Sequence, residues 1–177
     1  MYTPYTYFKG FTTQKLVIEK LEEMYKSKHE KDISKIKYKT DKYVPSTTVK
    51  SSNYNKTFEK RFSISSRASF DEKAKATGVP KSIIMNVFRR GIAAWNSGHR
   101  PGTNPYQWGY SRVNSFLTLG CTAFSGDADL LKKVYNMKGS NEKRKNFLSQ
   151  RVSCPKSKLD KFKKSKNFPE FIFKNKK

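Results

Sequence analysis

Side chains that could contact nucleic acid are concentrated in residues 81–90. Lys81, Asn86, Arg89 and Arg90 would share the polar face of a helix there, because the aliphatic residues of the same stretch fall on the other face. Lysine and arginine bind phosphate oxygens, and arginine and asparagine also pair with base edges in the DNA grooves. This stretch therefore predicts a helix that contacts nucleic acid.

The residues around that helix have the spacing of a helix-turn-helix. Ala74 would be the small residue of a first helix, and Gly78 would take the tight turn. The aliphatic residues that would hold the second helix against the core are Val79, Ile84 and Val87. Position 73, which is often apolar in such motifs, is Lys73. Two helices joined by a glycine turn also occur in proteins that never meet nucleic acid, so the spacing alone does not establish that function.

A second candidate site is the loop of sequence HRPG at residues 99–102. Arg100 and Arg112 could hold a phosphate there, together with the amides that open the following helix. The alternative is a rigid turn whose side chains bind backbone carbonyls, which we favour for His99. The sequence leaves both interpretations open for the two arginines.

The overall charge favours a polyanionic partner. The 177 residues include 38 Lys+Arg and 14 Asp+Glu, for a net charge of +24. Such an excess creates a positive field and disfavours self-association. We therefore expect nucleic acid in preference to an acidic protein surface or an anionic membrane. We take double-stranded DNA as the target, although the charge does not distinguish DNA from RNA.

Much of this charge lies outside the expected core. Residues 70–137 hold nine basic and four acidic residues, whereas residues 138–177 hold fourteen and three. The basic residues of this tail that we expect to contact phosphates diffusely are Lys143, Arg144, Lys145, Lys161, Lys163 and Lys164. Because lysine-rich segments read no bases, sequence preference would be weak.

The sequence offers little for catalysis or for a metal ion. Two histidines, His29 and His99, are too few for a histidine-liganded nuclease, and there is no Walker loop, dinucleotide fingerprint or nucleophile elbow. Asp127 and Asp129 could pair on a metal, but a place in the first turn of a helix explains them more simply. We expect no enzymatic activity, no metal and no cofactor.

The cysteines and the hydropathy pattern bear on the cellular compartment. Cys121 and Cys154 are the only cysteines, are far apart and lack a CxxC partner, so we expect free, buried thiols and no structural zinc. No stretch approaches the roughly 20 apolar residues that span a bilayer, and the N-terminus lacks the order of a signal peptide. We expect a protein of the cytoplasm, the nucleus or a particle interior, neither secreted nor bound to a membrane.

Helical periodicity and capping residues predict a mainly α fold. A first helix is expected over residues 13–28, with Thr12 or Thr13 as its N-cap. Its apolar side would consist of Val17, Leu21 and Met24. Ser125 would cap a late helix, with Asp127 and Asp129 near its positive end.

A helix between these two has a stronger start signal. Asn104 would cap it, Pro105 would occupy its first position, and Gln107 would reach back to the cap. Gly120 would end it. The signal predicts both ends of this helix.

These signals divide the chain into four parts. Residues 1–34 hold an aromatic arm and an amphipathic helix, 35–69 a basic Ser/Thr/Lys linker, 70–137 the helical core domain, and 138–177 a basic C-terminal arm. We expect a small helical domain with a helix-turn-helix-like centre, an extended linker and a basic tail that orders on a partner. The apolar end FPEFIFK, at 168–174, would pack on the body or on a neighbouring subunit.

Residues 91–116 carry a signature of the form GxxAWxxGHRPG followed by QWGYSRVNSF. The residues of its first half are Gly91, Ala94, Trp95, Gly98, His99, Arg100, Pro101 and Gly102. YFKG at 7–10 and ADLL at 128–131 accompany it. In these residues the sequence resembles an uncharacterised domain family of large double-stranded DNA viruses, including the nucleocytoplasmic viruses of algae and protists, and of phages.

The resemblance implies a viral origin, and with it a virion or genome-associated role in place of a cellular regulator. It implies no activity, so nucleic-acid binding still rests on the charge and the helix pair. We expect a basic viral protein that condenses or packages the genome in the virion, and that lies in the host cytoplasm or nucleus during infection. The alternative is a minor capsid protein whose arms bridge neighbouring subunits. A DNA-processing enzyme, the second alternative, would need an acidic cluster that the sequence does not supply.

Overall fold

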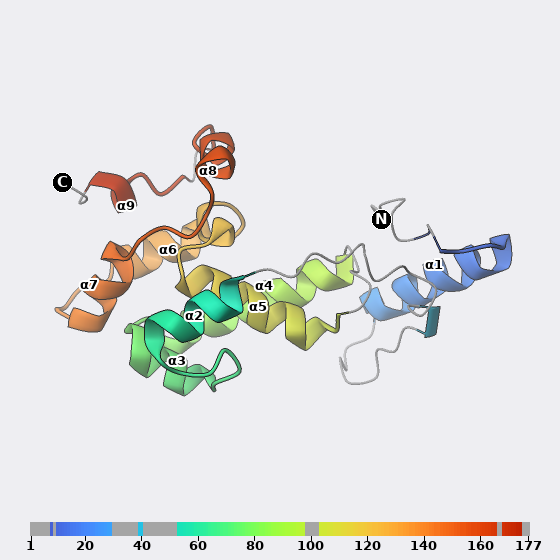
Figure 1. The fold of residues 1–177 in the computed structure, drawn as a ribbon, viewed down its shortest axis with the longest axis horizontal. Helices are drawn as coiled ribbons and strands as arrows, with labels where there is room; N and C mark the ends of the chain where they lie inside the picture. The colour runs from blue at the N-terminus through green and yellow to red at the C-terminus, as the bar shows by residue number, and fades with distance from the viewer. Residues whose placement is uncertain are drawn as a thin grey trace. The chain divides into compact units, whose positions relative to one another are not determined.

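The structure is a computed structural model, and it describes Phe8 and residues 10–29, 39–40, 53–97, 103–165 and 168–174 (Figure 1). Within these residues every regular element is a helix, which confirms the predicted mainly α class. The elements are α1 (Gln14–His29), α2 (Tyr54–Phe62), α3 (Phe70–Thr77), α4 (Lys81–Ser97), α5 (Pro105–Leu117), the 3-10 helix η5 (Cys121–Phe124), α6 (Ala128–Tyr135), α7 (Glu142–Ser149), α8 (Lys156–Phe162) and α9 (Phe171–Lys174). No described helix is long and apolar enough to cross a membrane.

The chain forms two compact units. Unit 1 comprises the described residues of Met1–Ser51 and Arg90–Trp108, and unit 2 those of Ser52–Arg89 and Gly109–Lys177. The helices α4 and α5 therefore each contribute residues to both units.

Unit 2 has an apolar core that includes the predicted helix-turn-helix. The predicted core positions Val79, Ile84 and Val87 are all fully buried. Gly78 has a left-handed conformation, with φ +70°, and ends α3, so the predicted turn is confirmed. Burying each large aliphatic side chain stabilises the fold by about 1.5–3 kcal/mol, and this holds α4 against the rest of the unit.

The C-terminal segment belongs to the same core. Phe147 of α7, Leu159 of α8 and Ile172 of α9 are buried in the cluster that also contains Phe116. The prediction of a basic arm that orders only on a partner is therefore wrong for the described part of this segment. Its apolar side chains are few and widely spaced, but three short helices bring them onto one surface. The apolar end packs on the body of the chain, which was one of the two expected outcomes.

The expected linker also contains a helix. Within it, α2 buries Phe58 completely, and the Arg61 guanidinium donates hydrogen bonds to the Thr118 carbonyl at 2.9 Å and to the Gln150 amide oxygen at 2.8 Å. An extended linker is thus wrong for α2, because one buried aromatic ring and one arginine anchor it. Residues 41–52 lie outside the described residues.

The end of α5 differs from the prediction. The helix ends at Leu117, and the residue with a left-handed backbone is Leu119, at φ 50°, in place of Gly120. The Leu119 side chain is fully buried, and its carbonyl accepts hydrogen bonds from the amides of Ser153 at 3.0 Å and Cys154 at 3.3 Å. Tertiary contacts therefore hold a conformation that costs a non-glycine residue free energy.

These contacts lie beside a disulfide. Cys121 and Cys154 form a disulfide bond with a Cα–Cα distance of 4.6 Å, so the prediction of two free thiols is wrong. The residues are 33 positions apart, and no sequence motif links them. Their proximity results from the return of the chain through α6 and α7 to the end of α5.

Of the three helix N-caps predicted from the sequence, two are confirmed and one is wrong. The amide of Gln107 donates to Asn104 Oδ1 at 2.8 Å, and the Asn104 amide donates to Gln107 Oε1 at 3.1 Å, which confirms the predicted box. Thr13 Oγ1 accepts from the Leu16 amide at 3.4 Å, as expected of an N-cap. Ser125 does not cap α6, because Asp127 holds the N-cap position and the Ser125 hydroxyl donates to the Cys121 carbonyl at 2.9 Å.

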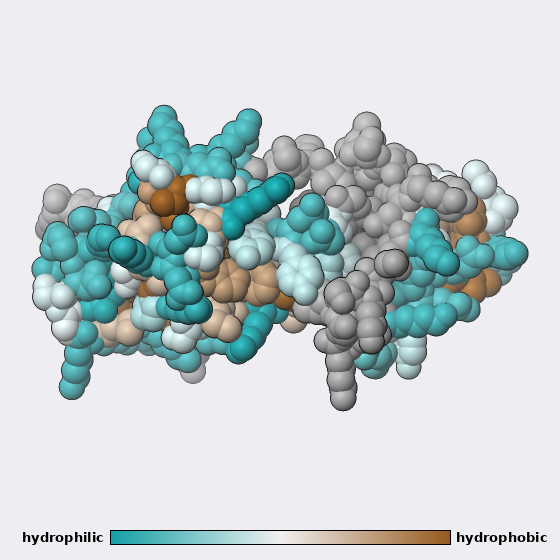
Figure 2. All heavy atoms as spheres, turned by 90° about the horizontal axis from the view of Figure 1, so that it is seen from below, coloured by the Kyte–Doolittle hydropathy of each residue, from teal (hydrophilic) through white to brown (hydrophobic). Residues whose placement is uncertain are grey.

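In unit 1, the buried face of α1 agrees with the prediction only in part, with Val17 half-buried. Met24 is buried, but Leu21 is 39 % exposed, together with Ile18 at 48 % and Tyr25 at 62 %. Figure 2 shows this hydrophobic surface over α1, at its right-hand end. The Lys20 side chain is fully buried instead. The α1 stripe, meaning Ile18, Leu21 and Tyr25, is thus accessible.

We expect the disulfide to contribute substantially to stability. Replacing both Cys121 and Cys154 by serine should lower the free energy of unfolding by about 3–4 kcal/mol, because the crosslink restricts the unfolded chain. Urea unfolding followed by circular dichroism measures this loss. Reductant should lower the free energy of unfolding of the wild-type protein by the same amount and leave that of the double variant unchanged. The expectation would be contradicted if the urea unfolding curve of the wild-type protein did not change in reductant, once thiol titration has shown that the disulfide is reduced.

Candidate nucleic-acid interface

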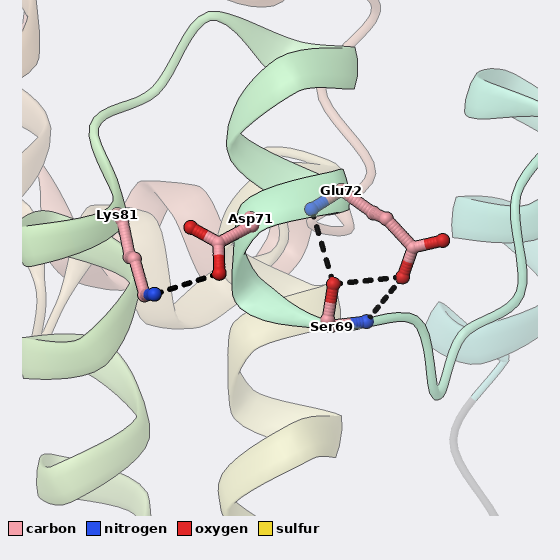
Figure 3. Close-up of polar contacts among 4 residues, drawn as sticks. All are labelled: Ser69, Asp71, Glu72 and Lys81. Atoms are coloured by element: carbon pink, nitrogen blue, oxygen red, sulfur yellow. Dashed lines mark hydrogen bonds and ion pairs between the residues drawn. The ribbon is translucent and has the colours of Figure 1, made fainter.

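The start of α3 is held by reciprocal hydrogen bonds between Ser69 and Glu72 (Figure 3). The Glu72 amide donates to Ser69 Oγ at 3.2 Å, and the Ser69 amide and hydroxyl both donate to Glu72 Oε2 at 2.8 Å. The two bonds that the Glu72 carboxylate accepts, first that from the Ser69 hydroxyl and then that from the Ser69 amide, lower the pKa of Glu72. The box satisfies amides that the first turn of a helix leaves unpaired, and so fixes where the helix-turn-helix begins.

Lys81 links the two helices of this motif. Its Nζ lies 2.7 Å from Asp71 Oδ2, between the start of α4 and the first turn of α3 (Figure 3). The two side chains are 49 % and 71 % exposed. Exposed pairs contribute only about 0–1 kcal/mol, so this ion pair leaves the Lys81 ammonium open to exchange its carboxylate for a phosphate.

The start of α7 lies against the turn between α3 and α4. A Cβ atom on Gly78 would lie 2.5 Å from the Arg144 amide nitrogen and 2.6 Å from Asn141 Oδ1, so only glycine permits this approach. The Lys143 Nζ donates to the Lys75 carbonyl at 2.9 Å, and Lys75 is itself exposed. We define the turn cluster as Lys75 at the end of α3, Lys81 at the start of α4 and Lys143 at the start of α7, three lysines on the helices that adjoin this turn.

The α4 face continues from this cluster along one helix. Asn86 and Arg89 are exposed, as predicted from the helical period. Arg90, the neighbouring residue, is half-buried and interacts within the chain. The α4 face is therefore defined here by Asn86 and Arg89, with Lys81 at its beginning.

Arg112 has a different environment from the other predicted contacts. Its Nε and Nη2 donate to the two carboxylate oxygens of Asp127 at 2.9 and 3.0 Å. Asp127 is fully buried and the Arg112 side chain is 15 % exposed. The pair joins α5 to the start of α6 and directs this part of the guanidinium inward. Arg100, its expected partner in a phosphate site, lies outside the described residues, as does the loop at 99–102.

The other predicted contacts of the tail fall into two groups. On α7, the Arg144 guanidinium donates to the carbonyls of residues 137–139, and Lys145 lies 3.7 Å from Glu142. On and just after α8, Lys163 bonds Asp160 at 2.8 Å, while Lys161 and Lys164 are exposed. Figure 1 shows α8 and α3 at opposite ends of unit 2. The structure thus brings Lys143 to the helix-turn-helix and leaves the α8 lysines on another surface.

Sequence reasoning missed the role of Lys73. Its side chain is fully buried, and its Nζ donates to the Ser66 carbonyl at 2.9 Å and to Asn114 Oδ1 at 2.8 Å. The same ammonium lies 4.0 Å from the centre of the Phe58 ring. Burial lowers the pKa of Lys73 from 10.5 to about 8, although the charge of Glu59 opposes this. The lysine at an ordinarily apolar motif position was the signal that could have revealed it.

The part of the chain that the structure describes is all-helical, with a helix-turn-helix unit and exposed lysines on the helices that adjoin its turn. Among the described residues, no three His, Cys, Asp or Glu side chains gather in a way that could hold a metal ion. The family model described as "Family of unknown function (DUF5824)" matches residues 4–131, and the chain belongs to this family. The match ends within α6, so α7 and Lys143 lie beyond it. Neither a curated protein nor a solved structure matches the chain.

We expect the stability of the protein to rise between about pH 8 and pH 10.5. The pKa of Lys73 is lower in the folded state, so the unfolded chain binds more protons in this window and higher pH favours folding. Denaturant unfolding at a series of pH values measures the rise. Lys73→Met should abolish it, and Lys75→Met, on the exposed side of the same helix, should retain it. If the free energy of unfolding rose equally with pH in the two variants, the buried Lys73 ammonium would be excluded as the cause.

We also expect Asp127→Asn to destabilise the protein by about 3–5 kcal/mol, because it leaves the Arg112 guanidinium without its buried charge partner. The control is Asp129→Asn, at an exposed position of the first turn of α6. That change should cost no more than about 1 kcal/mol. Thermal unfolding of the two variants measures both losses of stability. Similar losses would show that the buried Arg112–Asp127 pair stabilises the protein no more than the exposed Asp129 does.

Proposed function

We propose that this protein binds nucleic acid mainly through its phosphates, using the turn cluster and the α4 face. The observation that carries the proposal is that Lys143 of α7 reaches the helix-turn-helix, because its Nζ donates to the Lys75 carbonyl in the last turn of α3 at 2.9 Å, while Lys81 is exposed at the start of α4. Lys143 lies far from Lys75 and Lys81 in the sequence, and it reaches α3 only because α7 starts against Gly78. Cations that the fold brings to one helix-turn-helix suit a polymer of regularly spaced negative charge better than cations scattered over the chain do.

The same surface suggests weak sequence specificity. Lysine ammonium groups act as point charges and bind phosphates without reading bases. Asn86 and Arg89 are the groups of the α4 face that could form paired hydrogen bonds with base edges. Two such groups would give a preference for some sequences and not a strict code. Double-stranded DNA is the proposed target, with the α4 face directed toward a groove.

We further propose a viral origin and a role in condensing or packaging the genome within the virion. The origin rests on the resemblance of the signature at 91–116, and the role on the net charge of +24. The disulfide between Cys121 and Cys154 supports a particle that leaves the cell, because disulfides persist on virions and in other oxidising surroundings. Before assembly the protein would lie in the host cytoplasm or nucleus. Catalysis is no part of this proposal.

A triple variant tests the nucleic-acid interface. Lys81→Ala, Arg89→Ala and Lys143→Ala together should weaken binding to duplex DNA and make the dependence of log K on log salt shallower by about two to three, since each phosphate contact contributes roughly 0.9. Fluorescence anisotropy between 50 and 200 mM salt measures both quantities. The matched control removes the same charge from exposed lysines elsewhere, with Lys15→Ala, Lys26→Ala and Lys56→Ala.

The control should change the salt dependence much less than the triple variant does. Equal effects would mean that net charge alone, and not the turn cluster, drives binding. Weak binding of the wild-type protein at low salt would contradict the proposal altogether and favour a protein partner.

The second candidate is a minor capsid protein, and the α1 stripe favours it. Ile18, Leu21 and Tyr25 form an exposed apolar surface on one helix, which is typical of protein contacts. The apolar end at 168–174 no longer supports this candidate as it did in the sequence, because Ile172 is buried in the core of unit 2. Co-purification with the shell of disrupted virions, and not with the genome, would decide for the capsid role.

A further inference from the structure

Unit 2 contains a groove of about 500 Å³ formed by the end of α6, by α7 and by α9. One wall is aromatic, because the rings of Tyr135 and Phe171 stack with centroids 4.1 Å apart and an interplanar angle of 24°. Ile172, which is 3 % exposed, anchors α9 in the core beside this wall. Tyr135 is 42 % exposed and lines the groove together with Phe171, so part of this stacked pair is accessible to a ligand.

The α7 side of the groove is mainly polar and carries charges of both signs, Glu142 as well as Arg144 and Lys145, beside the apolar Leu148. Asn146 and Ser149 line the same side. Lys145 lies 3.7 Å from Glu142, with the two side chains 63 % and 75 % exposed, so this pair is loose and the ammonium can turn to another anion. Arg144 also lines the groove, and its bonds to the carbonyls of residues 137–139 hold the loop at the groove's rim.

We propose that this groove takes an unpaired base of single-stranded nucleic acid. The base stacks on Tyr135, its edge meets the amide of Asn146 and the hydroxyl of Ser149, and the adjoining phosphate lies at Lys145. The proposal rests on the proposed function and extends it to a second kind of contact. Aromatic platforms beside cationic side chains are how proteins bind single strands without sequence preference.

The aromatic pair in the groove and the charge of the whole chain favour this ligand over a peptide. A supported aromatic ring offers a flat surface, which suits a base better than an aliphatic side chain. A net charge of +24 favours a polyanion. The helix α7 also connects the two sites, because Lys143 belongs to the turn cluster and Lys145 to the groove. A duplex on the turn cluster could therefore continue as a displaced strand into the groove.

The test is binding of a short oligothymidylate that carries one 2-aminopurine, with the full chain. Tyr135→Ala should weaken binding by about 5- to 100-fold and remove the quenching of 2-aminopurine that stacking causes. Tyr135→Phe should retain both, because the ring and not the hydroxyl is required. The matched control, Tyr25→Ala, removes an exposed tyrosine of α1 and should leave both unchanged. Duplex affinity should be the same in all three variants, which also shows that they fold.

Two results would overturn the inference. If Tyr135→Ala binds the oligothymidylate as the wild type does, the groove holds no base. The proposed duplex interface is tested independently by the variant of Lys81, Arg89 and Lys143. If Tyr135→Ala loses binding to an acidic aromatic peptide and not to the oligothymidylate, the groove is a protein-binding site.

Discussion

The structure of unit 2 depends on the burial of one charged group. The Lys73 ammonium has no access to water, and a buried ammonium is costly unless acceptors surround it. Its acceptors are the Ser66 carbonyl and Asn114 Oδ1, and the Asn114 amide in turn donates to the Ser66 carbonyl at 3.0 Å and to Asn55 at 2.9 Å. This network joins α2, α3, α5 and the turn before α3. It therefore fixes the position from which the helix-turn-helix projects.

The second constraint is the return of the C-terminal segment to the end of α5. The Leu119 carbonyl accepts hydrogen bonds from the amides of residues 153 and 154. The disulfide between Cys121 and Cys154 links the same two segments covalently. Between these ends the chain passes through α6 and α7. Phe147 is buried against the core on the way, which places the start of α7 at Gly78 and one wall of the aromatic groove on its other side. Both proposed contacts with nucleic acid are consequences of this one path.

Local features of the fold could be predicted from the sequence. The box of Asn104 and Gln107 and the left-handed Gly78 were predicted, because each depends on residues within one helical turn of one another. Ser125 was a wrong prediction of the same kind: its hydroxyl has a competing carbonyl at Cys121. The wrong predictions at Cys121 and in the C-terminal segment have another cause, since they depend on pairs of residues far apart in the chain. For the candidate site, the exposure of Asn86 and Arg89 followed from the helical period. The position of Lys143 beside the end of α3 could not be predicted in this way.

By itself the sequence determined the helical class, the ends of several helices and a large positive charge, because propensity, capping and composition act over a few residues or add up over the whole chain. The tertiary structure alone decided which cations share a surface, which lysine is buried and which cysteines meet. Those outcomes depend on how apolar side chains from distant segments fill one core. Two lysines of identical chemistry, Lys73 and Lys75, therefore lie two positions apart in the chain with one in the interior and the other on the surface.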